Sequence, residues 1–155
     1  MNEFFFNEIR NGNLKEVKAM LTVNPMLVNS KDERVATPLI LATYYDEEEI
    51  MSLLLDHGAK IDAKDASGNT ALMGVCFKGY EDVAKKLIEK GANVNECNAV
   101  GATCLIYAAT FNREEIAKLL IAHGADTSAK DVRGNTALDH AKMQGTPELI
   151  ALLEE

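Results

Sequence analysis

Residues 65–93 read DASGNTALMGVCFKGYEDVAKKLIEKGAN, and this stretch decides the fold. It opens with an Asp…Gly sequence that is typical of a tight turn, in which glycine accepts a positive φ. Thr70 then stands where a side chain can cap the start of a short helix. We expect this helix to run through Cys76 or Phe77 and to end at Gly79, where a left-handed residue is easiest to place.

A second helix follows in the same stretch. Leu87 and Ile88 come four and five residues after Val83, which places the three side chains on one apolar stripe of a helix. The Gly-Ala-Asn sequence at residues 91–93 closes this helix and returns the chain to the next turn. The stretch therefore predicts one helix-turn-helix unit.

This unit recurs along the chain with a period of thirty-three residues. A period in this range indicates stacked supersecondary units rather than one globular core. The residues that keep the step are Thr37, Thr70, Thr103 and Thr136, then Leu39, Leu72, Leu105 and Leu138, then Gly58, Gly91 and Gly124. We predict one all-α solenoid domain over residues 1–155. Its five units are 1–31 (a divergent N-terminal cap), 32–64, 65–97, 98–130 and 131–155 (the C-terminal cap).

The repeated pattern resembles the ankyrin repeat. The second unit carries the Thr-Pro-Leu sequence at residues 37–39, and three units carry a Gly-Ala pair three residues after Leu55, Ile88 and Ile121. The chain departs from the pattern in two ways: Val35 stands where a turn glycine is expected, and Ala71, Cys104 and Ala137 replace the proline. The resemblance implies helix-turn-helix units joined by short β-turn fingers, and a role in protein–protein interaction.

Composition excludes several kinds of partner. The formal net charge is −8, whereas binding to nucleic acid needs clustered Lys and Arg. No apolar run is long enough to cross a membrane, and the opening residues do not read as a signal peptide. Cys76, Cys97 and Cys104 lack CxxC spacing and are odd in number, which fits reduced thiols. We predict a cytoplasmic protein with no nucleic-acid or membrane partner.

The residues that the repeat does not need are the candidates for binding. In ankyrin proteins, the end of the first helix of each unit and the turn tips line the concave groove. At the helix ends this chain has Tyr44 and Tyr45, Phe77 and Lys78, Thr110 and Phe111, and Met143 and Gln144; Tyr107 and His140 share nearly the same face, and Arg34 and Arg133 lie at turn tips. We predict an exposed aromatic ribbon, which usually marks an interaction site. The alternative is that some of these rings pack between repeats.

Tyrosines, a histidine and nearby positive charges also suit a flat apolar ligand that carries carboxylates. Tyr and His are both known ligands of haem iron. Tyr44 or Tyr45 is the candidate iron ligand, and the alternative is that both rings contact a protein partner. We expect His57 and His123 to be structural, because each stands at a helix end that favours positive charge.

Some stretches match a narrower group than the general repeat. Residues 69–80, 101–111 and 136–141, with the divergent first unit, are similar to small bacterial ankyrin proteins encoded beside catalases. That resemblance implies a part in full catalase activity, and hence in resistance to hydrogen peroxide, by one account through supplying haem.

Three hypotheses of function follow. The first is a non-enzymatic binding protein that supports a catalase by binding or delivering haem or by docking on the enzyme. The second is a general interaction module that sequesters or neutralises a basic protein partner, such as a regulator, an effector or a toxin, with the acidic charge steering association. The third, an enzyme, is not supported, since the sequence offers no activated nucleophile and no metal cluster.

Overall fold

The computed structural model describes residues 2–155, in which every regular element is a helix. The prediction of an all-α repeat fold is confirmed. The chain divides into two compact units, which we call unit 1, ending at Ala71, and unit 2, beginning at Leu72. The proposal of one continuous five-unit array stays a prediction.

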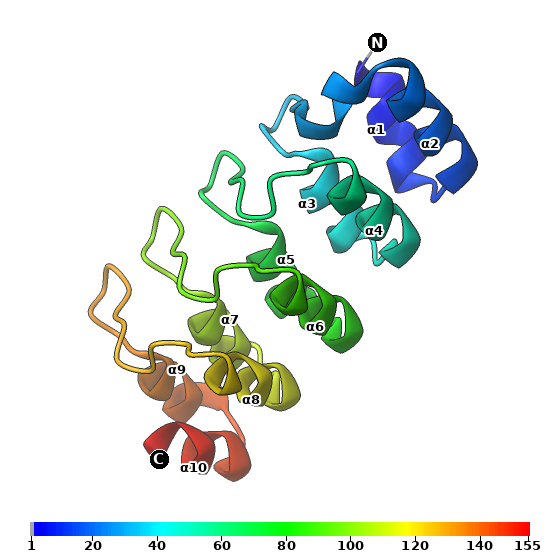
Figure 1. The fold of residues 1–155 in the computed structure, drawn as a ribbon. Helices are drawn as coiled ribbons and strands as arrows, with labels where there is room; N and C mark the ends of the chain where they lie inside the picture. The colour runs from blue at the N-terminus through cyan, green and yellow to red at the C-terminus, as the bar shows by residue number, and fades with distance from the viewer. Residues whose placement is uncertain (1) are drawn as a thin grey trace. The chain divides into compact units, whose positions relative to one another are not determined.

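Unit 1 contains two helix pairs (Figure 1). Its elements are α1 (Asn2–Arg10), α2 (Leu14–Val23), the short 3₁₀ helix η1 (Pro25–Asn29), α3 (Pro38–Tyr44) and α4 (Glu48–Asp56). Helix α1 packs against α2 and α3, and α4 packs against α2 and α3. The helices of the divergent first repeat are therefore integrated with those of the second.

The core of unit 1 confirms the apolar positions read from the first repeat. Phe6, Ile9, Val17 and Leu21 are all buried, and they pack in one cluster with residues of α3 and α4. Phe5 joins them, with its ring edge-on to Phe6 at a centroid distance of 6.0 Å. Burying each such side chain stabilises the fold by about 1.5–3 kcal/mol, so a core shared with the second repeat holds the first repeat in place.

Unit 2 contains three helix pairs (Figure 1). They are α5 (Ala71–Lys78, which begins at the last residue of unit 1) and α6 (Glu81–Glu89), α7 (Cys104–Thr110) and α8 (Glu114–Ala122), and α9 (Ala137–Gln144) and α10 (Pro147–Glu154). Helix α7 packs against α8 and α9, while α8 packs against α6 and α10. Each predicted repeat in this part of the chain thus supplies one first helix and one second helix.

Four turns before the first helices share one hydrogen-bond scheme. In each, the Oδ1 atom of an Asp or Asn accepts from the backbone N–H groups two and four residues later, at 2.9–3.1 Å. The residues that do so are Asp32, Asp65, Asn98 and Asp131. The position three residues later has a positive φ, which is 80° at Gly68 and 64° at Val35. The predicted turn fingers are therefore built by an Asx motif that tolerates a non-glycine residue.

Threonine caps the first helices as the sequence predicts. The hydroxyl oxygens of Thr37, Thr103 and Thr136 each accept from the backbone N–H three residues later at 3.2 Å. At Thr136 the carboxylate of Asp139 also accepts from the threonine backbone N–H, which completes a capping box. These bonds fix where α3, α7 and α9 begin.

The predicted core leucines differ at the last repeat. Leu39, Leu72 and Leu105 are each 1% exposed, whereas Leu138 is only partly buried. Helix α9, which carries Leu138, packs against α7 and α10, and within residues 2–155 no further first helix follows to cover its other side. Leu138 is therefore less buried than its three counterparts, because a core position in a repeat needs a neighbour on both sides.

Candidate functional site

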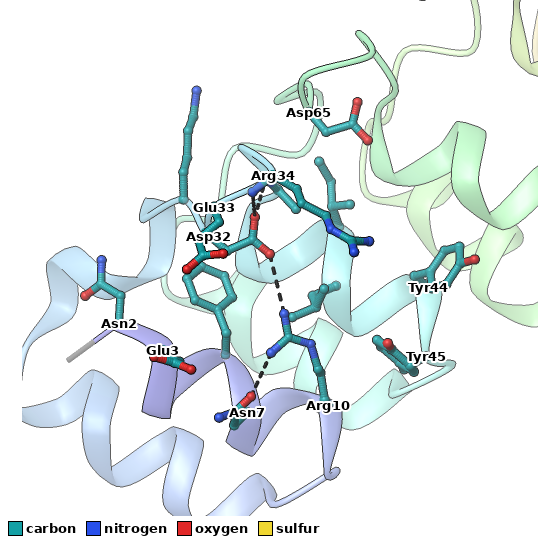
Figure 2. Close-up of a pocket in the computed structure, with 15 residues that line it drawn as sticks. Asn2, Glu3, Asn7, Arg10, Asp32, Glu33, Arg34, Tyr44, Tyr45 and Asp65 are labelled. Atoms are coloured by element: carbon teal, nitrogen blue, oxygen red, sulfur yellow. Dashed lines mark hydrogen bonds and ion pairs between the residues drawn. The ribbon is translucent and has the colours of Figure 1, made fainter.

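Unit 1 contains an open pocket of about 960 Å³ between α1, the turn that begins at Asp32 and α3 (Figure 2). Its lining residues are Asn2, Glu3, Phe6, Asn7, Arg10, Lys31, Asp32, Glu33, Arg34, Ala36, Ile40, Leu41, Tyr44, Tyr45 and Asp65. Three residues that the sequence identifies independently, Arg34, Tyr44 and Tyr45, line this one pocket. Its size is that of a typical small-molecule or peptide-side-chain site.

Asp32 organises the wall of the pocket. Its Oδ1 atom accepts from the backbone N–H groups of Arg34 and Ala36, both at 2.9 Å. Its Oδ2 atom lies 3.5 Å from Nη2 of Arg10, whose Nη1 donates to Oδ1 of Asn7 at 2.8 Å. Both carboxylate oxygens are therefore engaged, and the Arg10 guanidinium is held at the pocket by α1 and the turn together.

The Arg34 side chain is exposed at the turn tip. Its guanidinium has no hydrogen-bond or ion-pair partner among the residues that the structure describes. The next residue, Val35, has a φ of 64°, a left-handed conformation that is strained for a β-branched side chain. The backbone at Arg34 is fixed by Asp32, so an available cation is presented on a rigid turn.

Tyr44 and Tyr45 form the aromatic side of the pocket. Tyr44 is the last residue of α3 and Tyr45 is its C-cap, after which Asp46 turns the chain with a φ of 59°. Their rings lie edge to face, with centroids 5.6 Å apart and an interplanar angle of 81°. The two residues are 39% and 46% exposed. The edge-to-face contact between the two rings stabilises their arrangement, and the exposed aromatic surface is open to a ligand.

The donor types at this pocket fit haem. Tyr44 and Tyr45 offer phenolic oxygens, which can ligate haem iron, and Arg34 offers a partner for a propionate. Ile40 lies on the apolar floor with the buried Phe6. Ala36 and Leu41 add further apolar lining, while the other lining residues outside the tyrosines are polar or charged, so the pocket suits an open, reversible site better than an enclosed resident cofactor.

Unit 2 holds a separate aromatic cluster. The rings of Phe77, on α5, and Phe111, the C-cap of α7, lie edge to face at 4.7 Å and 86°. Phe111 also stacks on Tyr107, at 6.1 Å and 28°. Phe77 is 41% exposed and Phe111 is 38% exposed, so the cluster is ordered yet open to solvent. We call Phe77, Tyr107 and Phe111 the unit 2 aromatic cluster.

Two of the predicted site residues are held by the turn of their own repeat. Nδ2 of Asn98 donates to the Tyr107 hydroxyl at 2.9 Å, and one repeat later Nε2 of His140 donates to Oδ2 of Asp131 at 2.8 Å. The hydrogen bond from His140 and then the backbone N–H of Asn135 hold the pKa of Asp131 below its ordinary value. His140 is therefore engaged in a structural contact at its Nε2.

The remaining predicted site residues of unit 2 lie at or near helix ends. Lys78 places its Nζ 5.8 Å from the centre of the Tyr80 ring, a cation–π distance. Met143 is 62% exposed on α9, and Arg133 is exposed at its turn tip. Gln144 donates to the backbone oxygen of Thr110 at 2.9 Å and so caps the end of α7. The predicted ribbon is present as two local groups, one in each unit, and its continuity stays a prediction.

Sequence reasoning misses the residues that position these groups. Arg10 shapes the pocket, but the first repeat is too divergent to reveal its register. Arg113 donates from Nη2 to the backbone oxygen of Phe77 at 2.9 Å and so fixes the end of α5 beside the aromatic cluster. A usable signal exists for Asn98 and Asp131: each precedes its partner by nine residues. That spacing recurs with the repeat and could have indicated both pairs.

The other two histidines and the buried cysteines have ordinary surroundings. His57 and His123 each place Nδ1 2.9 Å from the backbone oxygen four residues earlier, at the end of a helix. Cys76 and Cys104 are buried, and the hydrogen bond that the Cys76 thiol makes with Cys104, together with burial, raises the pKa of the Cys76 thiol well above its ordinary value. These contacts are those of structural residues.

Comparison with known proteins identifies the repeat. A family model described as "Ankyrin repeats (3 copies)" matches residues 5–98 and again residues 76–155. No curated protein matches the chain. Over residues 2–155, no helix is long and apolar enough to span a membrane. The two family matches together cover nearly the whole sequence, and they agree with the helix pairs, threonine caps and turn fingers described above. The chain belongs to the ankyrin-repeat family.

Proposed function

We propose that this chain is a non-enzymatic, cytoplasmic binding protein that supports a catalase, by docking on the enzyme or by carrying haem to it. Ankyrin repeats are generally protein–protein interaction modules, and this coarser role follows from family membership. The finer role rests on the resemblance of residues 69–80, 101–111 and 136–141 to ankyrin proteins encoded beside catalases.

The observation that carries the docking proposal is the exposure of the unit 2 aromatic cluster. Ordered aromatic side chains that remain about 40% exposed lose little conformational freedom when a partner covers them. Such residues often dominate the free energy of an interface. Arg113 holds the backbone at Phe77 in place, so the cluster is presented to a partner without rearrangement.

The docking proposal is tested by mixing the purified chain with the catalase of its own cell and measuring affinity by biolayer interferometry. Phe77→Ala and Phe111→Ala should each weaken binding by roughly 30-fold or more, the effect of losing about 2 kcal/mol at an interface hot spot. The matched control is Met26→Ala, which removes an 85% exposed apolar side chain from unit 1. Equal weakening by all three variants, or no complex at all, would refute docking through this cluster.

The haem-carrier form of the proposal is supported by the pocket that Tyr44, Tyr45 and Arg34 line together. Hemin titration followed by the Soret band tests it. We expect a saturable shift that Tyr44→Phe or Tyr45→Phe removes, since each variant keeps its ring and loses only the phenolic oxygen. His140→Gln should change nothing, because His140 is engaged with Asp131. A spectrum indifferent to both tyrosine variants would end the carrier form.

The alternative is a module that sequesters a basic regulator, effector or toxin. The net charge of −8 supports it, because an acidic surface speeds association with a basic partner. This alternative predicts an association rate that falls steeply with added salt and a partner other than catalase. A complex with catalase whose rate is insensitive to salt would count against it.

A further inference from the structure

We propose that the unit 1 pocket binds a carboxylate carried beside an aromatic or apolar group on a partner protein, as on a Glu or Asp side chain or a chain terminus. This inference rests on the proposed interaction function and names the chemistry of one contact within it. Arg34 receives the carboxylate, and Tyr44 and Tyr45 receive the neighbouring apolar group.

The first argument is that Arg34 is an available cation, with the exposed Lys31 also in the pocket lining. Two carboxylates of the pocket lining are already engaged. Asp32 accepts hydrogen bonds through Oδ1 and forms an ion pair with Arg10 through Oδ2, and Asp65 accepts through Oδ1 from the backbone N–H groups of Ser67 and Asn69. Arg34 itself has no side-chain partner within the described part of the chain. Its planar fork of N–H groups matches the two oxygens of a carboxylate.

The second argument is that the surroundings of Arg34 favour a flat monoanion. Arg10 adds a second guanidinium, which Asp32 and Asn7 hold in place. Figure 2 shows Arg10, Arg34 and Tyr45 toward one end of the pocket and Asn2 and Glu3 toward the other.

Glu3 and Glu33 also line the pocket, and their negative charge opposes a phosphate dianion more strongly than a carboxylate. The rings of Tyr44 and Tyr45 are nearly perpendicular and partly exposed, so they offer aromatic surface to an aromatic or apolar group. The combination selects a carboxylate with an apolar neighbour rather than a bare anion.

The third argument is the strain beside Arg34. At the position that Val35 occupies, the other three turns have Gly68, Gly101 and Gly134, whose φ values are 74–81°. Val35 keeps a φ of 64° despite its branched side chain. Strained residues gather at ligand sites, where the surrounding structure maintains them. Here the strained residue is Val35, which directly follows Arg34, a residue of the pocket lining.

The probe is phenylacetate, a carboxylate next to an aromatic ring, with phenylacetamide as its neutral analogue and inorganic phosphate as a bare anion. Each is titrated into the full chain while the arginine Nε–Hε signals are followed by NMR. Phenylacetate should shift the Arg34 signal saturably, and it should bind about tenfold or more tightly than either of the other two, a difference of about 1.4 kcal/mol.

The variants supply the matched comparison. Arg34→Gln should weaken phenylacetate binding about tenfold, whereas Arg133→Gln, which changes the same turn position in the last repeat, should leave it within about twofold. Tyr45→Ala should weaken phenylacetate and leave phosphate unchanged. Equal binding of phenylacetamide, tighter binding of phosphate, or indifference to Arg34→Gln would overturn the inference.

This experiment is independent of the partner. Absence of both catalase docking and hemin binding would refute the proposed function and leave phenylacetate binding intact. Conversely, an unbound phenylacetate with an intact catalase complex would refute only the carboxylate pocket. Both Arg34→Gln and Arg133→Gln retain the backbone N–H that bonds to the turn carboxylate, so each variant should fold.

Discussion

The turns that begin at Asp32 and Asp131 share one backbone hydrogen-bond scheme and differ in the side chain that contacts the carboxylate. In both, Oδ1 accepts two backbone N–H groups at 2.9–3.0 Å. The second oxygen of Asp131 accepts from His140 of its own repeat at 2.8 Å, whereas that of Asp32 lies 3.5 Å from Nη2 of Arg10, on α1 of the preceding repeat. Leu41 stands three repeats before His140, and its apolar side chain cannot make the histidine contact.

The two turns also differ in the side chains that lie beside them. A turn tied to its own helix by His140 satisfies its carboxylate locally. The turn that Arg10 joins to α1 has a second arginine in the same pocket lining as Arg34, Tyr44 and Tyr45. The two turns therefore share one backbone hydrogen-bond scheme and differ in the partner of the second carboxylate oxygen.

The largest expected difference concerns the leucine that follows each turn. Leu39→Ala should cost about 2–5 kcal/mol of unfolding free energy, because it removes a side chain that is 1% exposed and leaves a cavity. Leu138→Ala should cost about 1 kcal/mol, because Leu138 is only partly buried. Urea unfolding of both variants measures the two losses of unfolding free energy. Equal losses would mean that Leu138 is covered in solution.

The turn tips give the next comparison. Gly134→Val should destabilise by about 1–2 kcal/mol through backbone strain alone, because a Cβ at Gly134 meets no atom within 4 Å. Val35→Gly should stabilise by less, about 0.5 kcal/mol, since relief of strain is partly offset by the greater freedom of glycine in the unfolded chain. Thermal melting of both variants checks the signs. A destabilised Val35→Gly would show that the valine side chain contributes more than its strain costs.

The sequence is a good guide to these turns and a poor guide to their partners. Threonine caps, turn positions and most core leucines recur every thirty-three residues, so their environment repeats as well. The periodicity also identifies Arg34, Tyr44 and Tyr45 as residues that the repeat does not need. The role of Arg10 could not be predicted, because its contact joins a divergent repeat to the next one. The partial exposure of Leu138 could not be predicted either, because it depends on a neighbour that the repeat pattern assumes.

The two carboxylate partners should differ modestly in their effect on stability. His140→Ala removes a 2.8 Å hydrogen bond between side chains that are 19% and 10% exposed, which should cost about 1 kcal/mol. Arg10→Ala removes a 3.5 Å pair in which the arginine is 35% exposed, which should cost about 0.5 kcal/mol. Double-mutant cycles with Asp32→Asn and Asp131→Asn separate each pair from loss of packing. A larger coupling energy between Arg10 and Asp32 than between His140 and Asp131 would mean that the turn at Asp32 is the more tightly held.

The smallest expected effect is a pH dependence of stability that arises only at the turn beginning at Asp131. The hydrogen bond from His140, and then the backbone N–H of Asn135, lower the pKa of Asp131 in the folded state. A carboxyl whose folded pKa is depressed binds protons more readily when unfolded, so its contribution is present above the unfolded pKa of about 3.9 and is lost as pH falls through the folded value.

The variant that tests this pH dependence is Asp131→Asn. It should keep the turn, because Asn98 builds the same one, and it should remove the contribution of the carboxylate. The stability difference between the original chain and the variant, measured by urea unfolding, should therefore be constant near about pH 5 and shrink below about pH 4. A difference that grows as the solution becomes more acidic would mean that the folded state raises the pKa of Asp131, which contradicts the contact with His140.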